Sequence, residues 1–233
     1  MKSYYEQWLE EGIKWMSDYR RRILIMMTVK VMPSVIFLLG VIFGLMQMLS
    51  YGTAEDAIGG ALGGGIMGAA ISLLCILFLL PGLNPKRLSR SIQKAVKSLN
   101  MNESERELLG QEMLIAARNP ECIVNFDIVK PRSKETPARF ILSPHYACLW
   151  GSIPLAILVR LSDVAAIHPD EEKEMEVTYG TQSRTLHRFT LYTILFYYKR
   201  IFSENSEKED EADIKMEFVN PKIRDKIFNM LQK

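Results

Sequence analysis

The stretch IGGALGGGIMGAAISLLCILFLL (residues 58–80) decides the fold class of this protein, because it is apolar and carries no charged residue. Its 23 residues would form a helix of about 34 Å at a rise of about 1.5 Å per residue. A second stretch, VMPSVIFLLGVIFGLMQML (residues 31–49), is also uncharged and corresponds to about 28 Å. Both are long enough to cross the hydrocarbon layer of a membrane, which is about 30 Å thick. The short polar sequence between them predicts an antiparallel helical hairpin.

Basic residues flank this predicted hairpin on both sides and are absent from its connecting turn (50–57). They are Arg20, Arg21, Arg22 and Lys30 before it and Lys86, Arg87, Arg90, Lys94 and Lys97 after it. Because Lys and Arg accumulate on the cytoplasmic side, we expect a multi-pass protein of the cell (inner) membrane with both termini in the cytoplasm. A cleaved signal peptide is the alternative, but the apolar sequence starts late, is too long and lacks a small-residue cleavage site.

Glycines in both apolar stretches are regularly spaced. Gly60, Gly64 and Gly68 recur every four residues and therefore share one helix face, and the first stretch carries Gly40 and Gly44 at the same spacing. In lipid, close approach of backbones drives helix association, and small residues permit it. We expect the two glycine faces to pack against each other within the hairpin. Packing between protomers, a pore lining, and the ordinary abundance of glycine in membrane helices are the alternatives.

Residues 1–22 predict an amphipathic helix, because aromatic and apolar residues recur at spacings of three and four opposite acidic ones. Trp8 and Trp15 lie on the apolar side. Tryptophan beside a membrane span favours the headgroup region, so we expect an interfacial helix on the inner leaflet. An ordinary helix that packs on the soluble domain is the alternative.

The remainder of the chain is of soluble type. Residues 83–118 predict two linker helices, the first capped by Asn84 with Pro85 in its first turn and the second running from about 102 to 118. Residues 119–233 contain seven short β-branched and aromatic segments, followed by a helix that starts at Asn220 and Pro221. The predicted fold class is an α+β membrane protein: an interfacial helix (1–22), a transmembrane hairpin (23–82), linker helices (83–118), and a small antiparallel β sandwich or partly open barrel closed by a C-terminal helix (119–233).

Antiparallel strands closed by one C-terminal amphipathic helix, together with the segment IPLAILVRLSDVAAIHP (153–169), resemble pleckstrin-homology-like domains. Many uncharacterised bacterial membrane proteins carry such a domain beside two spans. The resemblance covers about residues 119–233 and implies binding or scaffolding without catalysis. It transfers no catalytic residue.

Candidate chemistry is sparse in this sequence. His145 and Cys148, with Cys122 on another strand, are the residues to weigh as zinc ligands, but their spacing is not a ligand pattern. No nucleophile and base occur in a supporting context, and GGALGGG lacks the Lys-Ser/Thr end of a phosphate loop. We therefore expect no metal, no cofactor and no enzymatic activity. A net charge of +2 argues against nucleic-acid binding, and three scattered cysteines are consistent with a reducing compartment.

The segment KPRSKETPAR (130–139) is the candidate contact for an anionic ligand or lipid. It carries Lys130, Arg132, Lys134 and Arg139. A solvated hairpin tip is the alternative interpretation.

From these features we expect a membrane-anchored binding or scaffold protein that holds a small cytoplasmic domain at the inner leaflet. Its expected partners are the lipid bilayer, a protein, and a second copy through the glycine face. An accessory subunit of a transport or envelope complex that docks through the glycine-rich span is the alternative.

Overall fold

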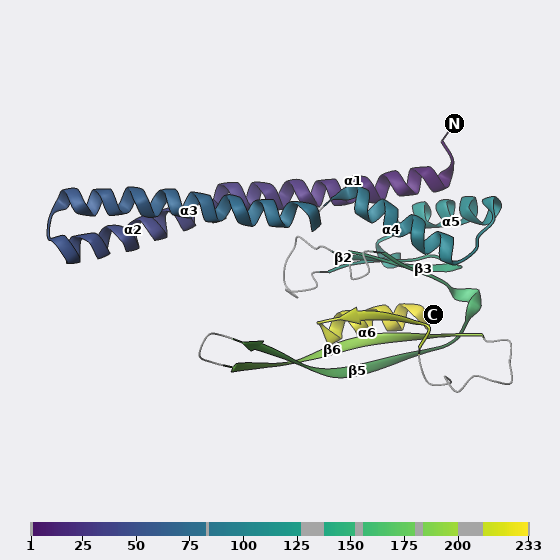
Figure 1. Ribbon diagram of the computed structural model, residues 1–233. Helices are drawn as coiled ribbons and strands as arrows, with labels where there is room; N and C mark the ends of the chain where they lie inside the picture. The colour runs from purple at the N-terminus through teal and green to yellow at the C-terminus, as the bar shows by residue number, and fades with distance from the viewer. Residues whose placement is uncertain are drawn as a thin grey trace. The chain divides into compact units, whose positions relative to one another are not determined.

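The computed structural model describes residues 2–82, 84–126, 138–151, 156–179, 184–199 and 212–232 (Figure 1). Contacts divide the chain into two compact units. We call Met1–Gly12 with Leu88–Lys233 the domain, and Ile13–Arg87 the hairpin unit. The domain thus includes the start of the first helix and most of the linker helices as well as the strands.

The hairpin unit is built from three helical segments. Helix α1 (Tyr4–Met26) begins in the domain, continues through a wide π-type turn (Met27–Val31) and leads into α2 (Met32–Tyr51). The wide turn precedes Pro33, whose ring nitrogen cannot donate the hydrogen bond that an α-helix requires. The hydroxyl of Ser34 donates to the carbonyl oxygen of Lys30 at 2.7 Å, which satisfies one of the backbone groups in this turn.

Helix α3 (Ala54–Gly82) returns antiparallel to α2 and packs along it (Figure 1). The turn between them is shorter than the predicted 50–57, because Gly52 adopts a left-handed conformation (φ 80°) and the Thr53 hydroxyl caps the new helix by accepting from Asp56 N at 3.2 Å. Two helical segments, Tyr4–Ser50 and Ala54–Phe78, are long and apolar enough to cross a membrane by length and composition.

The linker helices form where their caps predict them. Helix α4 (Pro85–Ser98) follows Asn84, whose side chain accepts from Lys86 N at 3.0 Å. Helix α5 (Glu103–Ala116) starts with a capping box between Asn102 and Glu105.

Within the described residues, seven antiparallel strands form two open sheets, in agreement with the seven β-branched and aromatic segments of the sequence. One sheet has the order β1-β2-β3-β4 and the other β5-β6-β7. The strands are β1 (Ile123–Phe126), β2 (Ala138–Leu142), β3 (Tyr146–Trp150), β4 (Ala156–Arg160), β5 (Val164–Tyr179), β6 (Arg184–Tyr198) and β7 (Ile214–Phe218). Helix α6 (Pro221–Leu231), capped by Asn220, follows the last strand. The sheets are not closed into a barrel.

Strand β5 is longer than its sequence suggests. Its polarity predicts a loop at His168 and Pro169 and through the acidic stretch 170–174, but the strand starts at Val164 and continues through both. His168 and Pro169 pair with β6, opposite Leu195 and Ile194. The strand tolerates Pro169 because β5 lies at the edge of its sheet, where a missing donor interrupts no ladder on the outer side.

The two sheets and α6 share one hydrophobic core, which includes Phe140, Leu149, Phe196, Phe218 and Ile227. All five side chains are buried. Since side chains alternate along a strand, β3 sends Ala147 and Leu149 to this core and Trp150 to the opposite face.

Helices cover the second face of the first sheet. Trp8 of α1 is fully buried and its ring centroid lies 5.9 Å from that of Trp150. A side chain at Gly12 would touch Trp150 and Ile92 of α4, and one at Gly110 of α5 would clash with the backbone of Tyr5. The first half of α1 therefore packs on the domain, which was the alternative to an interfacial position. Whether the rest of α1 lies in a membrane interface stays a prediction.

Candidate functional site

The predicted glycine faces meet inside the hairpin unit. A Cβ atom at Gly60 would lie 2.6 Å from the carbonyl oxygen of Phe43, and one at Gly68 would lie 3.0 Å from Ile36 Cα. A Cβ at Gly64 would clash with the carbonyl oxygen of Leu39. Real Cβ atoms essentially never approach another atom more closely than 3.0 Å, so a larger residue at Gly60 or Gly64 would force α3 away from α2, and one at Gly68 would be tightly confined.

The first stretch takes part in the same contact. A Cβ at Gly40 would lie 3.2 Å from the carbonyl oxygen of Ala61, and one at Gly44 would lie 3.0 Å from that of Ala57. All five predicted packing glycines thus lie between α2 and α3. Gly59 and Gly63 differ, because no atom lies within 4 Å of a Cβ built on either.

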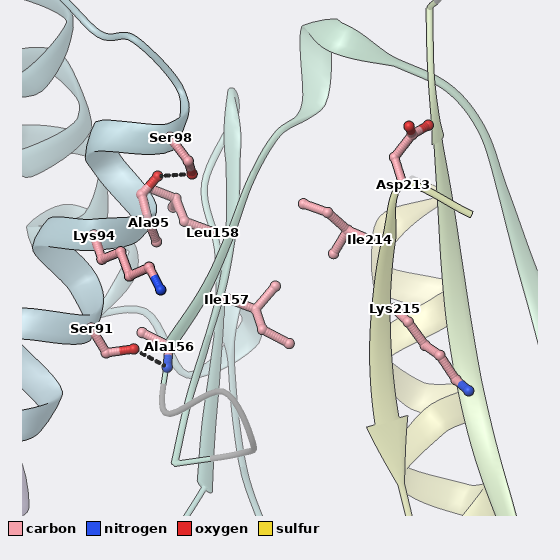
Figure 2. Close-up of a pocket in the computed structure, with 10 residues that line it drawn as sticks. All are labelled: Ser91, Lys94, Ala95, Ser98, Ala156, Ile157, Leu158, Asp213, Ile214 and Lys215. Carbon is pink, nitrogen blue, oxygen red and sulfur yellow. Dashed lines mark hydrogen bonds between the residues drawn. The ribbon is translucent and has the colours of Figure 1, made fainter. Parts of the chain in front are cut away.

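A pocket of about 360 Å³ opens in the domain beside two edge strands (Figure 2). Its lining comes from α4 (Ser91, Lys94, Ala95, Ser98), β4 (Ala156, Ile157, Leu158) and the start of β7 (Asp213, Ile214, Lys215). Strand β4 ends one sheet and β7 ends the other, so the pocket lies at an edge of each sheet. Figure 2 shows Ile157 and Ile214 pointing toward each other and Leu158 toward α4.

Polar groups line the α4 side of this pocket. The Ser91 hydroxyl accepts from Ala156 N at 3.0 Å and thereby satisfies a donor on the open edge of β4. Ser98 donates to the carbonyl oxygen of Ala95 at 2.8 Å. Lys94 extends its ammonium group toward β4 (Figure 2) and forms no ion pair with any residue that the structure describes. A ligand with an acidic group and an apolar part suits such a lining.

The charged side chains on the β7 side of the pocket already have partners within the protein. Lys215 pairs with Glu172 and points away from Ile157. Burial lowers the pKa of Lys215, but its hydrogen bond to Glu172 and the charges of Glu172 and Glu217 outweigh that effect and the pKa is raised. The carboxylate of Asp213 accepts from Tyr198 N at 2.8 Å. Of the basic side chains that line the pocket, Lys94 is therefore the one left to meet an anion.

The predicted anionic contact 130–139 falls mostly outside the described residues, which include Arg139 but not Lys130, Arg132 or Lys134. Arg139 lies within β2 and its Nε donates to Asn125 Oδ1 at 3.2 Å. Burial lowers the pKa of its guanidinium. Its neighbours are therefore protein groups on the sheet.

The three residues weighed as zinc ligands do not gather. Cys148 is buried in β3, where burial raises the pKa of its thiol well above the usual range. His145 lies just before β3 and its Nδ1 contacts the carboxylate of Glu112 on α5. Within the described part of the chain, no group of three His, Cys, Asp or Glu side chains is placed to hold a metal ion.

Sequence reasoning missed the pocket, although one signal for its α4 wall is present. Ser91, Lys94 and Ser98 are spaced three and four apart, which places them on one face of the helix. Their approach to β4 and β7 depends on contacts between segments more than 50 residues apart, so no local pattern could indicate it.

Comparisons with protein-family models, with curated proteins and with solved structures return no match for this chain.

Proposed function

We propose that this protein is a membrane-anchored binding or scaffold protein, in which the hairpin unit lies in the cell membrane and the domain lies at its cytoplasmic face. The observation that carries the proposal is the band of large apolar side chains exposed on α2 and α3. The exposed fraction is 74% for Phe37, 87% for Leu49 and 83% for Phe78. A soluble monomer rarely exposes such a surface, whereas lipid tails accept it without penalty.

The domain supplies the binding part of the proposal. Its antiparallel strands, followed by one terminal helix, are an arrangement that suits a small binding domain. The pocket beside Lys94 supports binding of a ligand with an acidic group. Its described lining offers one unpaired cation and apolar side chains but neither histidine nor cysteine.

The orientation rests on the basic residues that flank the hairpin and is tested by cysteine labelling in intact cells. In a background without native cysteines, Thr53→Cys in the α2–α3 turn should react with a membrane-impermeant maleimide. Lys97→Cys on the exposed side of α4 should react only after the membrane is broken. The opposite pattern would contradict the orientation, and equal labelling of both in intact cells would contradict the anchor.

An accessory subunit of a membrane complex is the second candidate, favoured by Gly59 and Gly63. Both face away from the α2–α3 contact, so they leave a flat strip on α3 against which another helix could pack. Purification in mild detergent separates the two candidates. Stoichiometric membrane partners that are lost in Gly63→Leu support the subunit, and recovery of the protein alone supports the scaffold.

A further inference from the structure

We propose that Arg20 and Arg21, with the apolar side chains beside them, bind the headgroup of an anionic phospholipid; this inference rests on the proposed membrane function. The two arginines line a hollow of about 620 Å³ that lies wholly within the hairpin unit. Its lining is Ser17, Arg20, Arg21, Leu24 and Ile25 of α1 together with Pro85. The α1 residues are spaced three, four, seven and eight from Ser17 and so form one face of the helix.

Among the described residues, no ion pair neutralises the charge in this hollow. The described lining contains no carboxylate, and neither guanidinium forms an ion pair. The nearest acid along the helix is Asp18. The neighbouring Arg22 donates from Nε to the backbone oxygen of Asp18 at 3.4 Å rather than to its carboxylate. Two guanidiniums one residue apart can each give a bidentate pair of hydrogen bonds to phosphate oxygens.

The hollow lies at the level where the apolar part of the hairpin ends. Gly40 lies near Gly65, and Ile36 lies near Gly68. The two helices are therefore antiparallel, and residues that lie at the same level have numbers that add up to about 104. Continued along the wide turn and α1, this register brings the end of α3 at Pro81 level with about Ile23. Apart from Lys30, which this register places near Leu74, the chain on both sides becomes polar at about this level, and Arg20 and Arg21 lie just beyond it on the N-terminal side of Ile23.

The chemistry of the lining favours a lipid over a soluble anion. Leu24 and Ile25 extend the hollow toward the apolar stretch, and the Ile25 side chain is 51% exposed. A phospholipid can place its phosphate on the guanidiniums and its glycerol and first methylenes against these two side chains. A free phosphate would use the charges alone.

The test uses the full chain, first washed in native membranes with alkaline carbonate and then purified in a neutral detergent. Binding of phosphatidylglycerol, phosphatidylcholine and inorganic phosphate is measured by native mass spectrometry and thermal shift. We expect phosphatidylglycerol to bind and stabilise selectively. Because each guanidinium of the lining should donate directly to the phosphate, and a hydrogen bond to a charged group is lost with each, Arg20→Gln with Arg21→Gln should weaken phosphatidylglycerol binding by about a hundredfold.

Arg22→Gln is the matched control, because it removes the same charge one position outside the lining and should leave affinity within about twofold. An equal loss in this control, or unchanged affinity in the double variant, would overturn the site. If inorganic phosphate raised the melting temperature and phosphatidylglycerol did not, the assignment to lipid would be overturned. Release of the protein by the carbonate wash would instead contradict the proposed function, so the two failures are distinguishable.

Discussion

The two units of this protein hold together by opposite means. In the hairpin unit, the helices meet through their smallest residues and point large apolar side chains outward, as Gly64 and Phe78 illustrate. In the domain, large side chains such as Trp8 and Phe140 are fully buried. Water drives apolar groups into a core, but lipid does not, so a helix pair in lipid depends on close contact between backbones. The same kind of substitution should therefore have opposite effects in the two units.

Loss of a large buried side chain should have the largest effect, and only in the domain. Trp8→Ala removes a fully buried ring from its contact with Trp150 and should lower the free energy of unfolding by about 3–5 kcal/mol. Tyr4→Ala, at a position 50% exposed on the same helix, is the control and should change stability little. Denaturant unfolding followed by tryptophan fluorescence measures both variants. Equal stability would show that α1 does not pack on the domain.

Gain of a side chain should have the next largest effect, and here the hairpin unit is the sensitive one. Gly64→Leu places a side chain against the Leu39 carbonyl oxygen, so α2 and α3 must separate, at about 1–3 kcal/mol or more. Gly63→Leu introduces the same residue one position away, where a Cβ meets no atom within 4 Å. Thermal stability and particle size in detergent compare the two. Equal behaviour would contradict the contact within the hairpin, and a change of size in Gly63→Leu alone would point to a second interface.

A smaller effect is expected at the helix ends of the domain. Asn102→Ala deletes the side chain that accepts from Glu105 N at 2.8 Å and should destabilise the domain by about 1 kcal/mol. Asn102→Asp keeps an acceptor and should restore most of this stability. Chemical denaturation of the three proteins tests the cap, and a loss in the Asp variant equal to that in the Ala variant would contradict it.

The last expected effect arises in the domain and is negligible at neutral pH, because it is a pH dependence confined to alkaline solution. Burial, followed by the charges of Asp163 and Asp213, raises the pKa of Tyr198 to about 12. The unfolded chain releases this proton near the ordinary value of 10.0 while the folded chain keeps it, so the contribution is complete below pH 10 and is lost as the pH rises toward 12. The denaturation midpoint should therefore fall as the pH rises from 10 to 12, and this fall should be smaller in Tyr198→Phe. An unchanged slope would show that this hydroxyl does not titrate differently in the folded state.

Local patterns predicted much of the framework because their causes are local. Asn84, Asn102 and Asn220 each cap a helix, as their neighbouring residues indicate. Seven strands form where β-branched and aromatic residues cluster. The prediction failed along β5, because acidic residues between His168 and Glu174 look like a loop when considered alone. Pairing with β6 keeps them extended at an edge where their side chains can reach water.

The sequence by itself determined two long apolar helices with a turn between them, the glycine spacing on their faces, and a β-rich region with a terminal helix. Length, charge and periodicity are properties of neighbouring residues, so they can be read directly. Only the tertiary structure decided that Gly60, Gly64 and Gly68 meet α2 and that Trp8 belongs to the domain. It also decided that a pocket opens beside β4. These outcomes depend on which faces meet across long stretches of chain, and shape complementarity between distant segments leaves no pattern in either segment alone.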